Sequence, residues 1–206
     1  MDQNLCRPKR RGPALRLIVV LGGLLGLAGA LPAAAEGEAL EMDTDRSSIE
    51  VLVQATFGPF TGRLPHYDAD IRVDVEHHSI GRAVVNFTFA DLKTGIALRD
   101  RHMGEWEDTA RYPNVSFHLD SLETAPDNRT IVHGGLMLHG IEHAISFPVS
   151  LLVAGSVYAI DGEAEIDYRD FGLPQIRKFW VLTVTPRLVV RFHLQGRLAA
   201  AAGGGK

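Results

Sequence analysis

The segment LVVRFHL, residues 188–194, has an apolar side chain at every second position from Leu188 to Leu194, with Arg191 and His193 between them. A strand points successive side chains to opposite faces, so this two-residue period predicts a strand with one apolar and one polar face. Similar apolar segments, most of them with the same period, occur at 49–54, 71–76, 85–89, 115–120, 131–138, 147–151 and 163–168. About eight such strands, each with one wet face, predict an antiparallel sheet.

Turn-forming residues separate these segments. We expect links at Gly58-Pro59, Pro126-Asp127-Asn128, Gly140 and Asp161-Gly162. Strands of this length and regularity favour a closed barrel, because closure leaves no unpaired strand edge. The sequence period also fits a β-sandwich, which stays open as the alternative.

Two long connections lack the two-residue period. Residues 91–113 are charged and tolerate a helix, so we expect a short helix at 99–105. It should end before Tyr112-Pro113, because the residue that precedes a proline is disfavoured in the helical region. Residues 170–186 form the second irregular connection, and we expect such connections to cover the mouths of the barrel.

The first 35 residues have the pattern of an export signal. Basic residues precede an apolar run at 17–31, and Pro32-Ala33-Ala34-Ala35 offers the small residues of a cleavage site. The run is shorter than the roughly twenty residues of a membrane-spanning helix. We therefore expect cleavage after about Ala35, no membrane span afterwards and a periplasmic or secreted protein, with a retained anchor as the alternative. The remaining chain divides into a disordered lead-in at 36–46, one domain at 47–198 and a flexible tail at 199–206.

Removal of the signal makes the chain acidic. Five of the 21 Lys and Arg residues and one of the 25 Asp and Glu residues precede residue 36, which leaves 16 bases, 24 acids and a net charge of −8. Nucleic-acid binding requires clustered Lys and Arg, so we expect none. The single cysteine, Cys6, lies in the signal. The oligomeric state stays open, with a homodimer as one alternative.

Several motifs in the chain resemble the signatures of the YceI-like family of polyisoprenoid-binding proteins. The first signature is a charged helix, an acidic or aromatic step and a Tyr-Pro that opens a strand. Its counterparts here are LRDRHM at 98–103, WED at 106–108, RYP at 111–113 and VSF at 115–117. The second signature, a hairpin before an alternating strand, resembles GLMLHGIE at 135–142 and PVSL at 148–151. Strand order and DFG at 170–172 also fit, and the similarity covers about residues 46–197.

The resemblance implies a lipocalin-like barrel whose apolar tunnel holds a polyisoprenoid chain. This sequence differs in its first strand, where Ala55-Thr56-Phe57-Gly58 replaces a turn that often contains histidine in the family. From the resemblance we expect an apolar isoprenoid lipid as the ligand, either a polyprenyl carrier or an isoprenoid quinone, and no other cofactor. The residues expected to contact it are Val51, Val53, Phe57, Ile71, Val73, Val85, Phe87, Phe89, His102, Trp106, Phe117, Phe147, Val149, Ile166, Val190 and Phe192.

Polar residues on the expected helix suggest a head-group site. Arg99 and Arg101 are candidates for a polar or phosphorylated head group, because guanidinium groups match oxyanions. A solvated helix face with internal ion pairs is the alternative. Trp106 could also close the end of the barrel as a hydrophobic cap.

Three other functions compete with lipid binding. An enzyme would use His102 with Glu105 or Asp108 as acid and base, but the sequence carries no P-loop, HExxH or nucleophile-elbow motif, so we expect none. A metal protein could use the nine histidines, yet His139 and His143 fall in an expected hairpin rather than on one helical face. A module for partner binding or stress response, without bound lipid, is the third.

Overall fold

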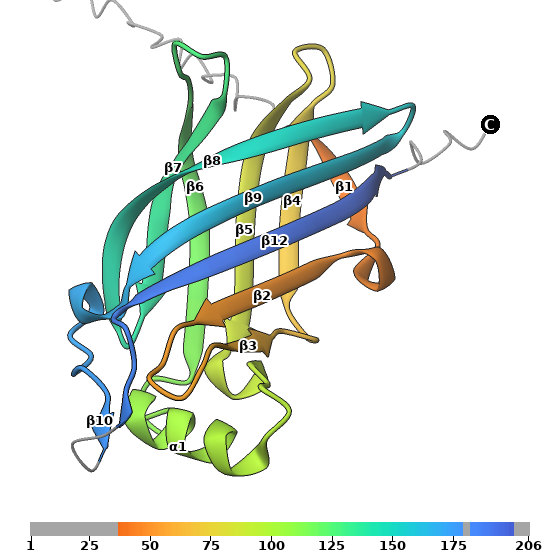
Figure 1. The fold of residues 1–206 in the computed structure, drawn as a ribbon. Helices are drawn as coiled ribbons and strands as arrows, with labels where there is room; N and C mark the ends of the chain where they lie inside the picture. The colour runs from red at the N-terminus through yellow and green to blue at the C-terminus, as the bar shows by residue number, and fades with distance from the viewer. Residues whose placement is uncertain (1–36, 179–181, 200–206) are drawn as a thin grey trace, which may run out of the picture. The chain divides into compact units, whose positions relative to one another are not determined.

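A computed structural model of the chain describes residues 37–178 and 182–199, and these form a β-barrel with a helix at one end (Figure 1). The predicted signal, its cleavage site and nearly all of the predicted tail lie outside the described residues. The strands are β1 (Glu38–Met42), β2 (Ser48–Val53), β3 (Phe60–Arg63), β4 (Asp68–Asp74), β5 (Ser79–Thr88), β6 (Asn114–Thr124), β7 (Thr130–Leu138), β8 (Ile141–Ala154), β9 (Val157–Asp167), β10 (Arg177–Lys178), β11 (Leu182–Thr183) and β12 (Arg187–Leu198). The helices are α1 (Ala97–Glu107) and the 3-10 turns η1 (Thr44–Arg46), η2 (Phe89–Asp91) and η3 (Tyr168–Phe171).

Eight antiparallel strands close the barrel. Their order is β1-β4-β5-β6-β7-β8-β9-β12, and β12 pairs back to β1, with Leu40 opposite Leu198. On its other side β1 pairs with β4, where Glu38 lies opposite Val73. The ladder therefore has no free edge in this part of the sheet, which confirms the predicted antiparallel barrel and excludes the sandwich.

The acidic segment expected to be a disordered lead-in contains an ordered strand and turn. β1 is placed there by pairing on both sides. Leu40 is buried in the core and Met42 packs against it, whereas the strand's other residues are acidic or small. The Asp43 side chain accepts from the backbone N–H of Arg46 (3.2 Å) and starts η1. β2 then pairs with the other half of β12, and Val51 lies opposite Val190. Strand formation in such a segment depends on tertiary pairing, which its local composition does not reveal.

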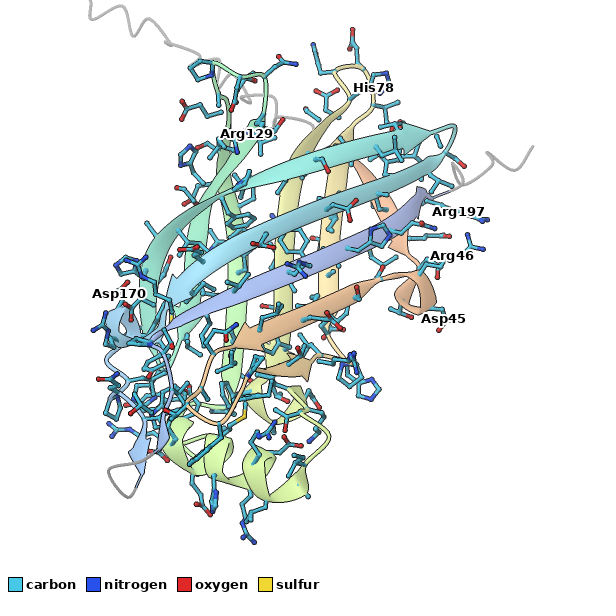
Figure 2. All side chains as sticks on the ribbon, in the orientation of Figure 1. Asp45, Arg46, His78, Arg129, Asp170 and Arg197 are labelled. Carbon is cyan, nitrogen blue, oxygen red and sulfur yellow. The ribbon has the colours of Figure 1, made fainter. Side chains whose placement is uncertain are left out.

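Polar side chains cover the outside of the barrel, as Figure 2 shows along β9 and β12. Across these two strands Arg191 pairs with Glu163 (2.8 Å) and His193 with Asp161 (2.7 Å). Asp161 and Gly162, expected in a link, lie inside β9, and the β8–β9 turn is at Gly155, whose φ is +62°. The inward face at position 162 still requires glycine, because a Cβ there would come within 2.3 Å of the Phe192 ring.

The helix α1 lies at the lower end of the barrel in Figure 1 and extends the helix predicted at 99–105 by two residues on each side. The Asp100 carboxylate accepts from the backbone N–H (2.9 Å) and the hydroxyl (2.5 Å) of Thr94, which fixes the first turn. Asp108 ends the helix in the left-handed region, with φ 58°. The end falls before Tyr112-Pro113, as the sequence indicates.

The connection at 170–186 contains the short hairpin of β10 and β11. The backbone N–H of Thr56 donates to the Thr183 carbonyl oxygen (3.0 Å), and Ala55 forms a bridge with Val184. This connection therefore packs against the β2–β3 loop at the same end of the barrel as α1.

Candidate functional site

The interior of the barrel holds a cavity of about 190 Å³. All 26 lining residues are hydrophobic, and they come from opposite walls of the barrel as well as from η2. Inward positions of alternating strands produce such a wall, because every second side chain points to the barrel axis. The site can therefore desolvate an apolar group but offers it no hydrogen bond from a lining side chain.

Eleven of the sixteen predicted ligand-contacting residues line this cavity. They are Val51, Ile71, Val85, Phe87, Phe89, Phe117, Phe147, Val149, Ile166, Val190 and Phe192. Near the middle, the Phe147 ring lies 5.7 Å from the Phe117 ring and 5.8 Å from the Phe192 ring, measured between centroids. Three rings from β6, β8 and β12 therefore meet inside the barrel and narrow the space available to a ligand.

Five predicted residues lie elsewhere. Phe57 is the clearest correction to the expected inward position, since it is 75% exposed in the loop after β2, where the two-residue period has ended. Val53 and Val73 are buried in the core but do not line the cavity. His102 is exposed on α1, and Trp106 packs outside the cavity.

The structure adds lining residues that were not predicted. Ala164, Leu188 and Leu194 occupy inward positions of strands whose period was recognised, so the same signal could have identified them. Leu64 and Leu92 lie in connections without any period. Their place in the cavity wall depends on how the connections fold back on the barrel.

Aromatic residues close the end of the barrel next to α1. The Trp106 indole N–H donates to the Pro174 carbonyl oxygen (2.9 Å), and the indole meets the Tyr168 ring edge-on at 5.0 Å. The Tyr168 hydroxyl donates to the Val184 carbonyl oxygen (3.3 Å) and accepts from the Ile176 backbone N–H (3.3 Å). This network supports the alternative role of Trp106, that of a cap.

A buried acid lies at the end of α1. Glu107 is 0% exposed, and neither of its carboxylate oxygens has a hydrogen-bond partner. The His139 Nδ1 donates to the Glu107 carbonyl oxygen (2.8 Å) and lies 3.6 Å from Oε2. Burial raises the pKa of the Glu107 carboxyl to about 7, and the Asp108 charge also raises it. The nearby His139 backbone N–H lowers this pKa by a smaller amount, although it does not form a hydrogen bond with the carboxylate.

The predicted head-group residues do not converge. The Arg99 guanidinium stacks over the Phe60 ring at 4.3 Å, whereas Arg101 is exposed and lies 3.9 Å from Glu105. These contacts match the alternative of a solvated helix face with internal ion pairs.

The histidines do not form a metal site in the described part of the chain, where no three His, Cys, Asp or Glu side chains come together. His143 Nδ1 donates to the Ala144 carbonyl oxygen (2.9 Å), while His139 is bound to Glu107. Among the same residues, no helix has the length and hydrophobicity needed to cross a membrane.

A family model described as the YceI-like domain matches residues 40–196 of the chain. The chain belongs to the YceI-like family. The resemblance inferred from the sequence motifs is therefore confirmed, and the family match covers almost all of the described barrel.

Solved structures share the YceI-like fold. BcnA of Burkholderia cenocepacia is 18% identical with a TM-score of 0.66, over 76% of this chain and 99% of that chain. A polyisoprenoid binding domain from Saccharophagus degradans, implicated in plant cell wall breakdown, is 18% identical with a TM-score of 0.63, over 79% and 99%. The Campylobacter jejuni YceI protein is 15% identical with a TM-score of 0.60, over 68% and 85%. A search of curated proteins finds no significant match.

Proposed function

We propose that this YceI-like protein binds an isoprenoid-type lipid, a polyprenyl carrier or an isoprenoid quinone, and sequesters or transports it. The observation that carries the proposal is the cavity inside the barrel, whose lining residues are all hydrophobic. The relative described as a polyisoprenoid binding domain supports the same class of ligand. The mechanism is passive, because removing apolar surface from water requires no catalytic group.

The size of the cavity defines which part of the lipid it holds. Each CH₂-sized group buried contributes roughly 0.8 kcal/mol, so a chain segment binds through contact area alone. The cavity of about 190 Å³ is smaller than the roughly 300–1,000 Å³ of pockets for drug-sized ligands. We infer that it accepts a slender segment and that a longer chain displaces side chains as it enters.

We further propose that the protein works outside the cytoplasm, in the periplasm or after secretion. The support is the sequence of the first 35 residues, with its basic start, apolar run and small residues before Glu36. Fractionation of cells that express the full chain, with N-terminal sequencing of the mature protein, tests this. An uncleaved protein in the cytosol would contradict it.

The lipid proposal is tested with the full chain, expressed with export and purified without detergent. Native mass spectrometry followed by solvent extraction should show an apolar molecule that is released on denaturation. Farnesol, a short isoprenoid alcohol, serves as a defined probe for titration of the emptied protein. A protein that is purified empty and takes up no farnesol would overturn the proposal.

Two matched variants on β9 locate the binding. Ala164 lines the cavity, so Ala164→Phe should fill it and abolish farnesol uptake. The next residue, Glu165, points outward and is exposed, so Glu165→Phe adds the same ring without changing the interior. Equal farnesol binding by two folded variants would show that the lipid binds elsewhere.

A further inference from the structure

A second hollow lies outside the barrel, between η2 and α1. It is a cleft of about 730 Å³ whose walls come from the residues around η2, from α1 and from the three residues after α1. Its apolar residues include Phe89 and Leu92, and its polar residues include Arg101 and Thr109. The cleft therefore differs from the barrel cavity in being both larger and partly polar.

Phe89 and Leu92 line the cleft and also the cavity. These two side chains therefore form the partition between the barrel interior and the cleft. Opposite them, a Cβ on Gly62 would come within 2.9 Å of Leu92 Cδ1, so the glycine provides the space that Leu92 fills.

The wall at this place depends on side chains rather than on a continuous strand ladder. The β5–β6 ladder ends at the pair of Thr88 and Asn114. Beyond this pair, backbone hydrogen bonds join residues 89–93 to neighbouring segments at two points. The Phe89 backbone N–H donates to the Pro113 carbonyl oxygen (2.8 Å), and Lys93 exchanges backbone hydrogen bonds with Arg63 (2.7 and 2.8 Å). Rotation of Phe89 and Leu92 side chains would open the partition without breaking either attachment.

The charged residues of the cleft indicate the kind of group that fits it. Two cations, Lys93 and Arg101, stand against three carboxylates, those of Asp100, Glu105 and Asp108. Lys93 Nζ already donates to a backbone carbonyl oxygen (2.6 Å), and Arg101 lies 3.9 Å from Glu105. Excess negative charge repels an anion, whereas a neutral polar group meets donors and acceptors without this cost.

We propose that the lipid enters and leaves the barrel between Phe89 and Leu92, and that its neutral polar head group, a hydroxyl or a quinone ring, stays in the cleft between η2 and α1. This inference rests on the proposed function and specifies both the route and the class of head group. It assigns the head group to the cleft surface, where only Arg101 of the two predicted arginines lies.

The route is tested by comparing two leucines of the cavity wall. Leu92 borders both hollows, whereas Leu119 on β6 borders the cavity alone. Stopped-flow fluorescence with parinaryl alcohol, a slender probe with a neutral head, should show uptake and release about tenfold faster for Leu92→Ala and within about twofold of wild type for Leu119→Ala. Equal rates in the two variants would overturn the route. Leu92→Val against Leu119→Val repeats the comparison if the alanine variants unfold.

The head group is tested with parinaric acid, which has the same tail and an anionic head at neutral pH. We expect it to bind about tenfold more weakly than the alcohol at low salt, with the difference reduced in Glu105→Gln, which removes one of the cleft's negative charges. Equal or tighter binding of the acid would overturn the head-group assignment. If neither probe nor farnesol binds, the proposed function itself fails, which separates the two conclusions.

Discussion

The buried acid at the end of α1 predicts a specific dependence of stability on pH. Glu107 is the one buried residue of the helix, and its carboxylate has no hydrogen-bond partner. Its pKa rises from the ordinary value of 4.5 to about 7 because burial disfavours the charged form. Between these two values the folded protein holds a proton that the unfolded chain releases. The stability that the protonated group retains below pH 4.5 is therefore lost as the pH rises through 7.

The size of this loss follows from the shift of the pKa. A tenfold change in proton affinity corresponds to roughly 1.4 kcal/mol, so the shift from 4.5 to about 7 corresponds to about 3 kcal/mol at most. It is an upper value, because Asp108, whose charge adds to the shift, is exposed and solvent screens that charge. Glu107→Gln keeps the shape and removes the charge. The free energy of unfolding of Glu107→Gln minus that of wild type should increase from pH 4.5 to about pH 7 and stay constant above it.

Urea denaturation followed by circular dichroism, between about pH 4 and about pH 8, measures this difference. Glu105→Gln is the control, because Glu105 lies exposed on the same helix and its removal should give no such change. Repeating the comparison in His139→Gln removes the imidazole that lies 3.6 Å from the Glu107 carboxylate. A difference between Glu107→Gln and wild type that is constant over the whole pH range would refute the reasoning.

Three further substitutions test the interior and the end of the barrel. Gly162→Ala should push the Phe192 ring, which lies 2.3 Å from the added Cβ, into the cavity. The substitution should lower stability by about 1–3 kcal/mol and weaken farnesol binding. Unchanged farnesol binding would contradict this prediction. Phe147→Ala should lower stability by about 3–5 kcal/mol and enlarge the cavity. In thermal unfolding with lipids of increasing size, longer chains should restore part of the lost stability, and a variant stabilised by none of the lipids would count against this prediction. Trp106→Phe should lose about 1 kcal/mol, through the hydrogen bond to Pro174, and keep the wild-type affinity for farnesol, whereas a large loss of affinity would place the indole against the ligand.

The fold could be predicted from the sequence wherever the two-residue period decides which side chains face inward. The alternation of β12 from Leu188 to Leu194 and that of β9 around Ile166 correctly gave a strand with one buried face. Most of the predicted lining residues follow from this period, because a strand directs every second side chain to the same face. The helix was also predictable, because residues 91–113 are charged and lack the two-residue period, and its end before Tyr112-Pro113 followed because proline restricts the residue before it.

Only the tertiary structure decided how the barrel closes and what separates its interior from the outside. The acidic segment around β1 contains a strand because β12 and β4 pair with it, and Phe57 faces outward because the chain turns after Val53. Leu92, which lies in a connection without any period, joins the cavity wall because its side chain packs over Gly62. The sequence determines local periodicity and conformational restriction, whereas pairing and packing between distant segments exist only once the chain is folded.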